Sequence, residues 1–266
     1  MAWGTGWDTG VVNQHYFSES PAGDFTPREI EVELAGRARS VLTAGGVFSP
    51  EHLDQGTALL LDTLPGLTEL PLVPAGEAAD ADADADAAAA AATVDHATAA
   101  GPAGGGPAVA EAPGAVEAPG TAASAAPILD IGCGWGPIAL AAALEHADRE
   151  VWAIDVNERS RELTRRNAER LGLANVRVAS PEDVPAGLEF SELRSNPPIR
   201  VGKEVLHGIL SEWLPRLVPG GSAYLVVAKH LGADSLQRWI AASFTDFEVD
   251  RVARKKGFHV LRAMRD

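Results

Sequence analysis

Residues 127–145 read PILDIGCGWGPIALAAALE, an apolar run that ends in a glycine-rich turn and continues as an alanine-rich stretch. The pattern predicts a strand, a turn and a helix from Pro137 to Glu145. Glycines let the backbone pass close to a ligand, and a helix start supplies free N–H groups. The turn glycines are Gly132, Gly134 and Gly136. A nucleotide-like ligand fits this turn, but the spacing G-x-G-x-G departs from the dinucleotide fingerprint, and a purely structural turn is the alternative.

Strands and helices alternate along the chain after this unit. Strands are predicted at VWAID, NVRVA, FSELRS and SAYLVVA, and helices over residues 157–171 and between Leu206 and Leu217. Pro215 must end or kink the second of these helices. The alternation predicts a doubly wound α/β sheet that binds ligands at the carboxyl ends of its strands.

Two acidic residues follow strands of this sheet. Asp155 ends the second strand, 19 residues after Gly136, where a carboxylate can accept hydrogen bonds from both ribose hydroxyls of an adenosine. The alternative is that Asp155 only stabilises the start of the helix at Asn157. Asp183 follows the third strand and could accept from the adenine amino group, although SPED is also an ordinary turn and capping sequence.

The N-terminal part of the chain predicts a small unit of strands and a helix. In REIEVELAG three apolar residues alternate with glutamates, which is typical of a strand with one exposed face. A second strand is expected around residues 39–43. The stretch SPEHLDQGTALLLDTL predicts a helix with Ser49 as its N-cap and Pro50 at its first position.

Residues 75–126 separate these two parts. They include ADADADADAAAAAA and contain eight acidic residues, no Lys or Arg, and few side chains large enough to form a core. Burial in such a segment cannot offset the entropy lost on ordering. We therefore predict a β/α extension over residues 1–74, a disordered insertion over 75–126 that acts as a linker, and a main domain over 127–266.

Composition limits the classes of function. The chain has 266 residues and a net charge of −15, which disfavours a nucleic-acid partner, but eight of the negative charges lie in the insertion. One cysteine, Cys133, excludes an internal disulfide and fits a reducing cytosol. The histidines show no metal-ligand spacing. No membrane span or signal peptide is evident, so a cytoplasmic protein without a metal is expected.

Several motifs together resemble a known family. DIGCGWGP, the strand end at Asp155, NPPI and PGG, in this order, resemble the class I S-adenosylmethionine-dependent methyltransferases. HYFSESP, GVFSPEHLDQGTALLL, SNPPIRVGKEVLHGIL and AKHLGADSL more narrowly resemble the small-domain methyltransferases typified by bacterial ribosomal RNA guanine-N2 methyltransferases. The resemblance covers His15 to about Arg262 apart from the insertion. It implies a Rossmann-like catalytic domain over residues 127–266 with S-adenosylmethionine as cofactor.

The resemblance also implies which residues bind the cofactor. The expected contacts are Asp130, Gly132, Gly134, Gly136, Asp155, Asp183 and Thr57. The family packs the N-terminal helix near the pocket, so Thr57 and Asp54 are expected near the methionine end of the cofactor. Helix capping and packing is the alternative for these two residues.

The NPPI motif implies the catalytic residues. An amino group conjugated to a purine is a poor nucleophile because its lone pair is delocalised. If the side-chain oxygen of Asn196 and the carbonyl of Pro197 each accept one N–H, they hold the nitrogen for attack on the methyl group. The prolines fix the backbone and leave the carbonyl free to accept. A strand-terminating Asn-Pro turn is the alternative for the tetrapeptide alone.

The substrate is inferred from residues around this motif. Pro198, Ile199, Arg200 and Lys203 are the expected substrate contacts. Methyltransferases of adenine N6 or of a glutamine amide usually have an aromatic residue where this chain has Ile199, which favours guanine N2. Further RNA contacts are expected from Arg194, Lys229, His230, Arg254, Lys255 and Lys256, with Phe258 or His259 stacking on a base. The alternative for residues 251–259 is a solvated hairpin tip followed by a phenylalanine in the core.

These observations predict an RNA methyltransferase acting on an exocyclic amine, with guanine N2 of small-subunit ribosomal RNA as the expected target. Two alternatives stay open. One is a protein glutamine-N5 methyltransferase, and the other is a non-catalytic, cofactor-binding ribosome assembly factor.

Overall fold

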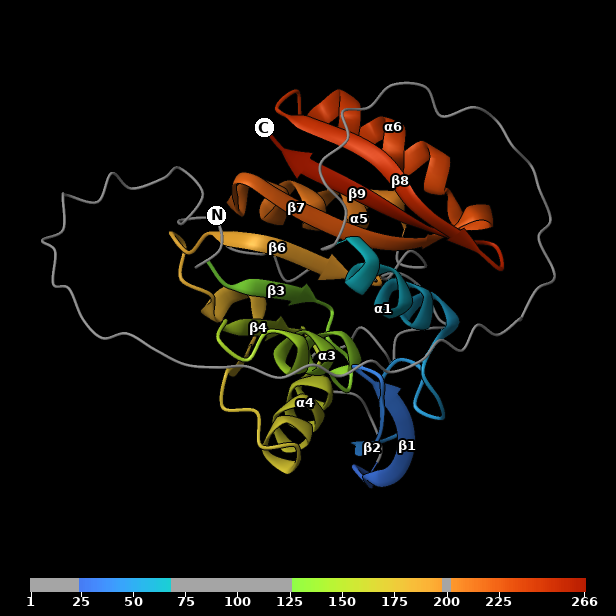
Figure 1. The fold of residues 1–266 in the computed structure, drawn as a ribbon, viewed down its shortest axis with the longest axis vertical. Coiled ribbons are helices and arrows are strands. Elements are labelled where there is room, and N and C mark those ends of the chain that lie inside the picture. Colours follow the sequence, from blue (N-terminus) through green and yellow to red (C-terminus); the bar gives the residue numbers. More distant parts are fainter. Residues whose placement is uncertain (1–23, 68–125, 198–201) are drawn as a thin grey trace, which may run out of the picture. The chain divides into compact units, whose positions relative to one another are not determined.

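A computed structural model describes residues 24–67, 126–197 and 202–266, which belong to one compact unit (Figure 1). This part of the chain contains a seven-stranded sheet in the order β5-β4-β3-β6-β7-β9-β8. Strand β9 is antiparallel to both of its neighbours, and the other pairings are parallel. The strands are β3 (Ile128–Ile131), β4 (Val151–Ile154), β5 (Val176–Ala179), β6 (Phe190–Ser195), β7 (Leu217–Ala228), β8 (Phe247–Lys255) and β9 (Phe258–Arg265).

Helices cover both faces of this sheet. They are α1 (Gln55–Leu67), α3 (Pro137–Glu145), α4 (Glu158–Arg170), α5 (Lys203–Trp213) and α6 (Ala233–Ser243), with short 3-10 turns η1 (Pro181–Asp183), η3 (Leu214–Arg216) and η4 (Lys229–Leu231). Successive residues of β7 show the two layers, because side chains of a strand alternate between faces. Val226 packs with Leu60 of α1, whereas Val227 packs with Leu210 of α5 and Leu236 of α6. The predicted doubly wound α/β fold is confirmed.

The N-terminal extension contributes two strands, β1 (Arg28–Leu34) and β2 (Arg37–Thr43), which pair antiparallel. The alternation predicted for β1 is confirmed, since its glutamates are exposed while Val32 and Leu34 are buried. The buried face packs against Trp135 and Leu163. The side chain of Asn167 in α4 joins this hairpin to the glycine loop, because its Nδ2 donates to the carbonyls of Leu42 and Trp135, both at 2.9 Å.

The start of α1 differs from the sequence prediction. Ser49 and Pro50 do not begin the helix; it begins at Gln55, and Asp54 caps it. Asp54 Oδ2 accepts from the backbone N–H groups of Gly56 at 2.9 Å and Thr57 at 3.1 Å. A carboxylate that satisfies two free donors and faces the positive end of the helix is a good cap. Ser49 instead has a positive φ of 45° and donates from its hydroxyl to the carbonyl of His52.

Most other predicted elements are confirmed. Helix α3 has the predicted bounds, and α4 begins after Asn157, whose side chain accepts from the Arg159 N–H. Pro215 lies in the 3-10 turn that follows α5. The PGG sequence, which alone suggests a turn, lies within β7 near a shift in its register with β6.

Several predictions fall outside the described residues. The HYFSESP motif, almost all of the 75–126 insertion, and Pro198, Ile199 and Arg200 are among them, so the proposed domain boundaries remain predictions. Within the part of the chain that is described, no helix is long and apolar enough to cross a membrane.

Candidate active site

The glycine loop between β3 and α3 forms one wall of the candidate site. Gly132, Gly134 and Gly136 have φ values of 77°, 59° and 100°, which L side chains rarely adopt. A Cβ atom at Gly136 would lie 3.0 Å from Thr164 Oγ1 of α4. The Thr164 hydroxyl in turn donates to the carbonyl of Gly134 at 3.0 Å. The loop therefore needs glycine both for its backbone conformation and for its close packing on α4.

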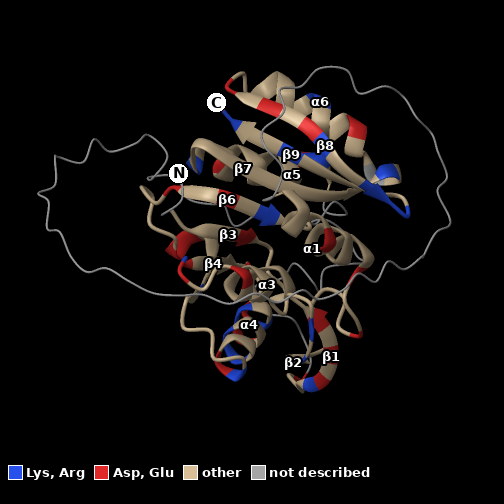
Figure 2. Ribbon diagram, viewed as in Figure 1, with Lys and Arg blue, Asp and Glu red and all other residues tan. Residues whose placement is uncertain are grey.

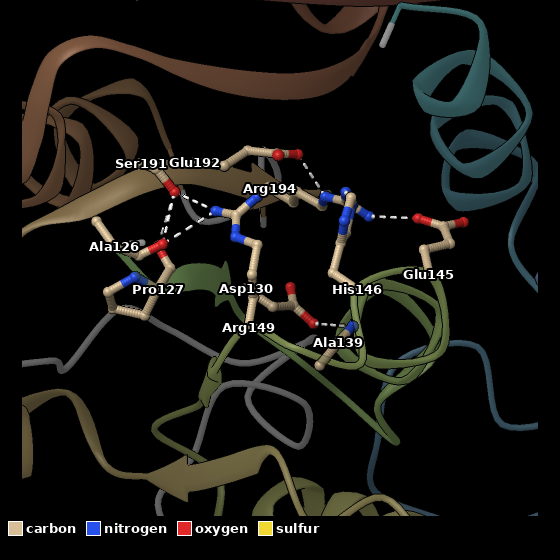
Figure 3. Close-up of polar contacts among 10 residues, drawn as sticks. All are labelled: Ala126, Pro127, Asp130, Ala139, Glu145, His146, Arg149, Ser191, Glu192 and Arg194. Atoms are coloured by element: carbon tan, nitrogen blue, oxygen red, sulfur yellow. Dashed lines mark hydrogen bonds and ion pairs between the residues drawn. The ribbon is translucent and has the colours of Figure 1, made fainter. Parts of the chain in front are cut away.

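Asp130 lies behind this loop. Its side chain is fully buried, and Oδ2 accepts from the N–H of Ala139 at 3.0 Å (Figure 3). Among the described residues, Oδ1 has no hydrogen-bond partner. Burial raises the pKa of the Asp130 carboxyl to about 8. Asp130 thus holds the first turn of α3 and supports the loop from behind, and a direct contact with the cofactor remains a prediction.

Asp155 joins the end of β4 to the glycine loop. Its half-buried carboxylate accepts from the N–H of Gly134 at 2.9 Å and from the N–H of Asn157 at 2.8 Å. Desolvation by burial raises the pKa of this carboxyl to about 6. Two oxygens that each accept one backbone N–H still have lone pairs for further donors. Both interpretations of Asp155, as ribose acceptor and as stabiliser of the helix start, therefore agree with its position.

Asp183 is exposed in η1, and its Oδ2 accepts from the Ser180 hydroxyl at 2.6 Å. The N–H of Asp183 also donates to the Ser180 carbonyl at 3.1 Å, which is the ordinary turn expected for SPED, but no side chain caps the backbone of η1. Neither Asp183 nor Asp155 lines the pocket described next, and the adenine contact of Asp183 remains a prediction.

A pocket lies between the glycine loop and the start of α1, with about 340 Å³ of empty space that is partly open to solvent. Its lining comes from three separate parts of the sequence: Phe48, Ser49, Asp54 and Thr57; Gly132, Cys133, Gly134, Trp135, Pro137 and Ile138; and Asn196. The structure thus brings the NPPI asparagine to the glycine loop, as expected for a transferase with one bound cofactor. It also brings Thr57 there, next to Asn196.

Aromatic residues of this lining were not singled out from the sequence. Phe48 is 47% exposed and stands at the pocket with a ring that could cover a planar group. Trp135 is buried and donates from Nε1 to the carbonyl of Ser49 at 3.3 Å. Trp135 could have been predicted at the site, because it lies inside the glycine-rich turn. Nothing in the sequence around Phe48 distinguishes it from a core phenylalanine.

The side chain of Asn196 is held at the end of β6. Its Nδ2 donates to Asp54 Oδ2 at 2.8 Å and to Thr57 Oγ1 at 3.0 Å. Within the described part of the chain, no donor contacts its Oδ1 atom. The adjacent Pro197 is buried. The carboxamide oxygen is therefore the end of the group that remains available to a ligand.

Arg194 was predicted to contact RNA, but the structure buries it. It is 2% exposed, and its guanidinium pairs with Glu192 at 2.6 Å and with Glu145 at 3.2 Å (Figure 3). A buried cation needs such partners because the desolvation penalty is large. Sequence reasoning missed this because Glu145 lies on α3, far along the chain, and only folding brings it to Arg194.

Other expected RNA contacts divide into exposed and buried residues. Lys203, at the first position of α5, is exposed, as are Lys229 and His230 in η4. The tip of the β8–β9 hairpin exposes Arg254, Lys255 and Lys256, and Figure 2 shows this tip as a basic segment. The N–H of Lys229 donates to the carbonyl of Gly257 at 2.8 Å, so η4 and the tip are adjacent.

His259 and Phe258 are not free to stack on a base. His259 is 5% exposed, so its predicted role is wrong. Phe258 packs in the apolar cluster under α1, as the alternative interpretation held. Strand alternation places these two residues on opposite faces of β9, and both faces are covered by helices.

A metal site requires several ligand side chains close together. Over residues 24–67, 126–197 and 202–266, no group of three or more His, Cys, Asp or Glu side chains is placed to hold a metal ion.

Comparisons with known proteins agree with this fold. The family model for the methyltransferase small domain matches residues 120–262. The uncharacterized protein YbxB of Bacillus subtilis is 29% identical over 255 residues, covering 95% of this chain and 98% of the relative. The release factor glutamine methyltransferase of Escherichia coli is 40% identical over 73 residues, which is 27% of this chain and 26% of that enzyme.

A solved structure shares the fold. The 16S rRNA guanine-N2 methyltransferase of T. thermophilus, in complex with AdoMet and guanosine, superposes with a TM-score of 0.60 at 17% identity. The match covers 92% of this chain but only 52% of that chain, so our protein spans about half the length of that enzyme. The protein described here belongs to the methyltransferase small domain family, a group of class I S-adenosylmethionine-dependent methyltransferases.

Proposed function

We propose that this protein transfers a methyl group from S-adenosylmethionine to an exocyclic amine of a base in RNA, with guanine N2 of small-subunit ribosomal RNA as the target. The observation that carries the proposal is the position of Asn196. Its carboxamide lies at the pocket beside the glycine loop, with the nitrogen bound to Asp54 and Thr57 and the oxygen available. A ribosomal substrate implies a cytoplasmic site of action.

The residues present fit S-adenosylmethionine. Gly132 and Gly134 line the pocket, and a Cβ atom at either position would have no other atom within 4 Å, so side chains do not cover the backbone there. Asp155 supplies a carboxylate at the adjoining strand end. When bound, this cofactor supplies an electrophilic methyl group on a sulfonium. Gly132, Gly134 and Asp155 would hold it, with Thr57 as a further proposed contact.

The chain's own part in the reaction is to hold and polarise an amine. Asn196 Oδ1 and the Pro197 carbonyl are the two acceptors proposed to bind the amine protons. Acceptors placed in this way fix the nitrogen's direction and favour positive charge developing on it during attack. Positioning and electrostatics suffice, and no covalent enzyme intermediate is needed.

An RNA substrate is supported by charge at the same edge of the sheet. Lys203, Lys229 and the hairpin tip at 254–256 are exposed near the carboxyl ends of the strands, although the whole chain is acidic. Phosphates are bound mainly by such exposed cations. The T. thermophilus enzyme, which shares the fold, acts on 16S rRNA at guanine N2.

A glutamine side chain of a protein is the second candidate substrate. The local match to release factor glutamine methyltransferase favours it, and two acceptors suited to an aryl amine would also suit an amide NH2 group. Its weakness is Ile199, where an aromatic residue is usual.

The deciding experiment is transfer of labelled methyl from S-adenosylmethionine to RNA from a strain lacking this gene, followed by mass spectrometry of the nucleosides. N2-methylguanosine at a single site is the expected product. Label in a protein would replace the proposal with glutamine methylation. Absence of label in every substrate, despite tight cofactor binding, would indicate a non-catalytic assembly factor.

A further inference from the structure

The carboxamide of Asn196 has two chemically opposite ends. Its oxygen accepts hydrogen bonds, whereas its NH2 group only donates. An incoming amine presents N–H donors, so a flipped carboxamide would set donor against donor at the reacting nitrogen. Catalysis by this residue therefore requires one of two rotational states to be selected.

We propose that Asp54 and Thr57 are positioning residues that lock the Asn196 carboxamide with its oxygen toward the substrate amine. The inference deepens the proposed function and rests on it. An ionised carboxylate has no proton to donate, so Asp54 Oδ2, at 2.8 Å, can face only the NH2 end of Asn196. The Thr57 hydroxyl takes the second N–H at 3.0 Å.

The lock is itself rigid. The same Asp54 oxygen accepts from the N–H groups of Gly56 at 2.9 Å and Thr57 at 3.1 Å, so the start of α1 holds the carboxylate in place. The Thr57 side chain is buried, at 3% exposure. A Cβ at Gly56 would approach Asp54 Oδ2 to 3.0 Å and the Phe258 ring to 3.1 Å, which shows how closely α1 packs on the sheet here.

A negative charge at the NH2 end also strengthens the oxygen end. Hydrogen bonds in a chain polarise one another, and a carboxylate acceptor is stronger than a neutral one. Asp54 should therefore make Asn196 Oδ1 a better acceptor for the positive charge that develops on the amine. This gives the N-terminal extension a part in the reaction, because α1 is its only described helix.

Capping of α1 is the competing explanation for Asp54, and substitutions can separate the two. Ser is as good an N-cap as Asp but has a shorter side chain, so Asp54→Ser keeps the cap and loses the contact with Asn196. Asp54→Asn can keep all three hydrogen bonds, because a single oxygen accepts them. Thr57→Val removes only the hydroxyl acceptor. Thr63→Val is its control in the same helix, where the hydroxyl donates to the Leu59 carbonyl.

The kinetic test measures kcat, the KM for RNA and the Kd for S-adenosylmethionine in each variant. For Asp54→Ser and Thr57→Val, we expect kcat to fall about 10–100-fold, because a misplaced acceptor lowers the fraction of reactive complexes. The cofactor Kd should not change in Asp54→Ser, and Asp54→Asn should recover most of the lost kcat. A raised cofactor Kd with normal kcat in Thr57→Val would overturn the locking role of Thr57 in favour of cofactor binding. Wild-type kcat in Asp54→Ser would overturn the role of Asp54.

A second readout needs no substrate. In wild-type protein, NMR should show side-chain amide protons of Asn196 that exchange slowly with water, and Asp54→Ser should make them exchange rapidly. If this protection is present but wild-type protein methylates no RNA, the proposed function fails while the lock stands. Fast exchange in an active wild-type enzyme would reject the lock alone.

Discussion

The two walls of the candidate site are built in different ways. The glycine loop comes from one continuous stretch, residues 130–138, and presents backbone to the pocket. The opposite wall depends on side chains 142 positions apart in the chain, because Asp54 holds Asn196. A wall made of backbone is damaged mainly by adding atoms, whereas a wall made of side chains is lost by removing one functional group.

The largest effect is expected at the side-chain wall. Asn196→Ala should lower methyl transfer about 10²–10³-fold, the usual range when one preorganised polar group is removed from a reacting centre. The cofactor Kd, measured by calorimetry, should stay at the wild-type value because the glycine loop is intact. Wild-type activity in this variant would remove Asn196 from catalysis.

The second-largest effect is expected at Asp155 and tests whether this residue binds the cofactor. Asp155→Ala should raise the Kd for S-adenosylmethionine about 10–100-fold, since hydrogen bonds to a charged group contribute about 1.5–3 kcal/mol. Glu158→Ala removes a carboxylate from the first turn of α4 and serves as the control for the helix-start interpretation. Equal Kd values for the two variants and the wild type would leave Asp155 with a structural role only.

Adding one methyl group to the backbone wall should mainly lower stability. Gly136→Ala meets both a φ of 100° and a contact at 3.0 Å with Thr164 Oγ1, so we expect the free energy of unfolding to fall by about 1–3 kcal/mol. Gly45→Ala is the matched control, because no atom lies within 4 Å of its Cβ position. Urea unfolding of both variants makes the comparison. Similar midpoints would show that the loop is less tightly packed than described.

The smallest effect, a change of about 1 kcal/mol between pH 7 and 8, concerns the buried carboxyl behind the loop. The pKa of Asp130 is raised from 3.8 to about 8, so the folded state keeps a proton that the unfolded state releases. The free energy of unfolding should therefore fall as pH rises between these values, by at most about 1.4 kcal/mol per pH unit for one group.

Asp130→Asn should flatten that dependence. Asp155, with a pKa raised to about 6, adds a fall of the same sign that is nearly complete by pH 7, so the range above pH 7 separates the two groups. Urea unfolding at pH 7 and 8 gives the slope for each protein. Identical slopes in the variant and the wild type would contradict the assigned pKa.

Local patterns predicted much of the fold, and their failures have physical causes. The bounds of α3 and the start of α4 next to Asn157 could be predicted, because a helix start depends on neighbouring residues. The start of α1 was misassigned, since Ser49 and Pro50 form a plausible cap and only the structure shows that Asp54 takes that role. Arg194 was misassigned because its burial depends on the position of β6 inside the sheet and on a second partner, Glu145, that is distant in sequence.

The sequence by itself determined five of the seven strands of the sheet, the glycine loop and the asparagine before two prolines. Those features depend on periodicity and on the conformational limits of glycine and proline, which act over a few residues. Tertiary structure alone decided which end of the Asn196 carboxamide faces the pocket, because that choice depends on Asp54 and Thr57 from the N-terminal extension. A hydrogen bond is made between atoms a few ångströms apart in space, wherever they lie along the chain.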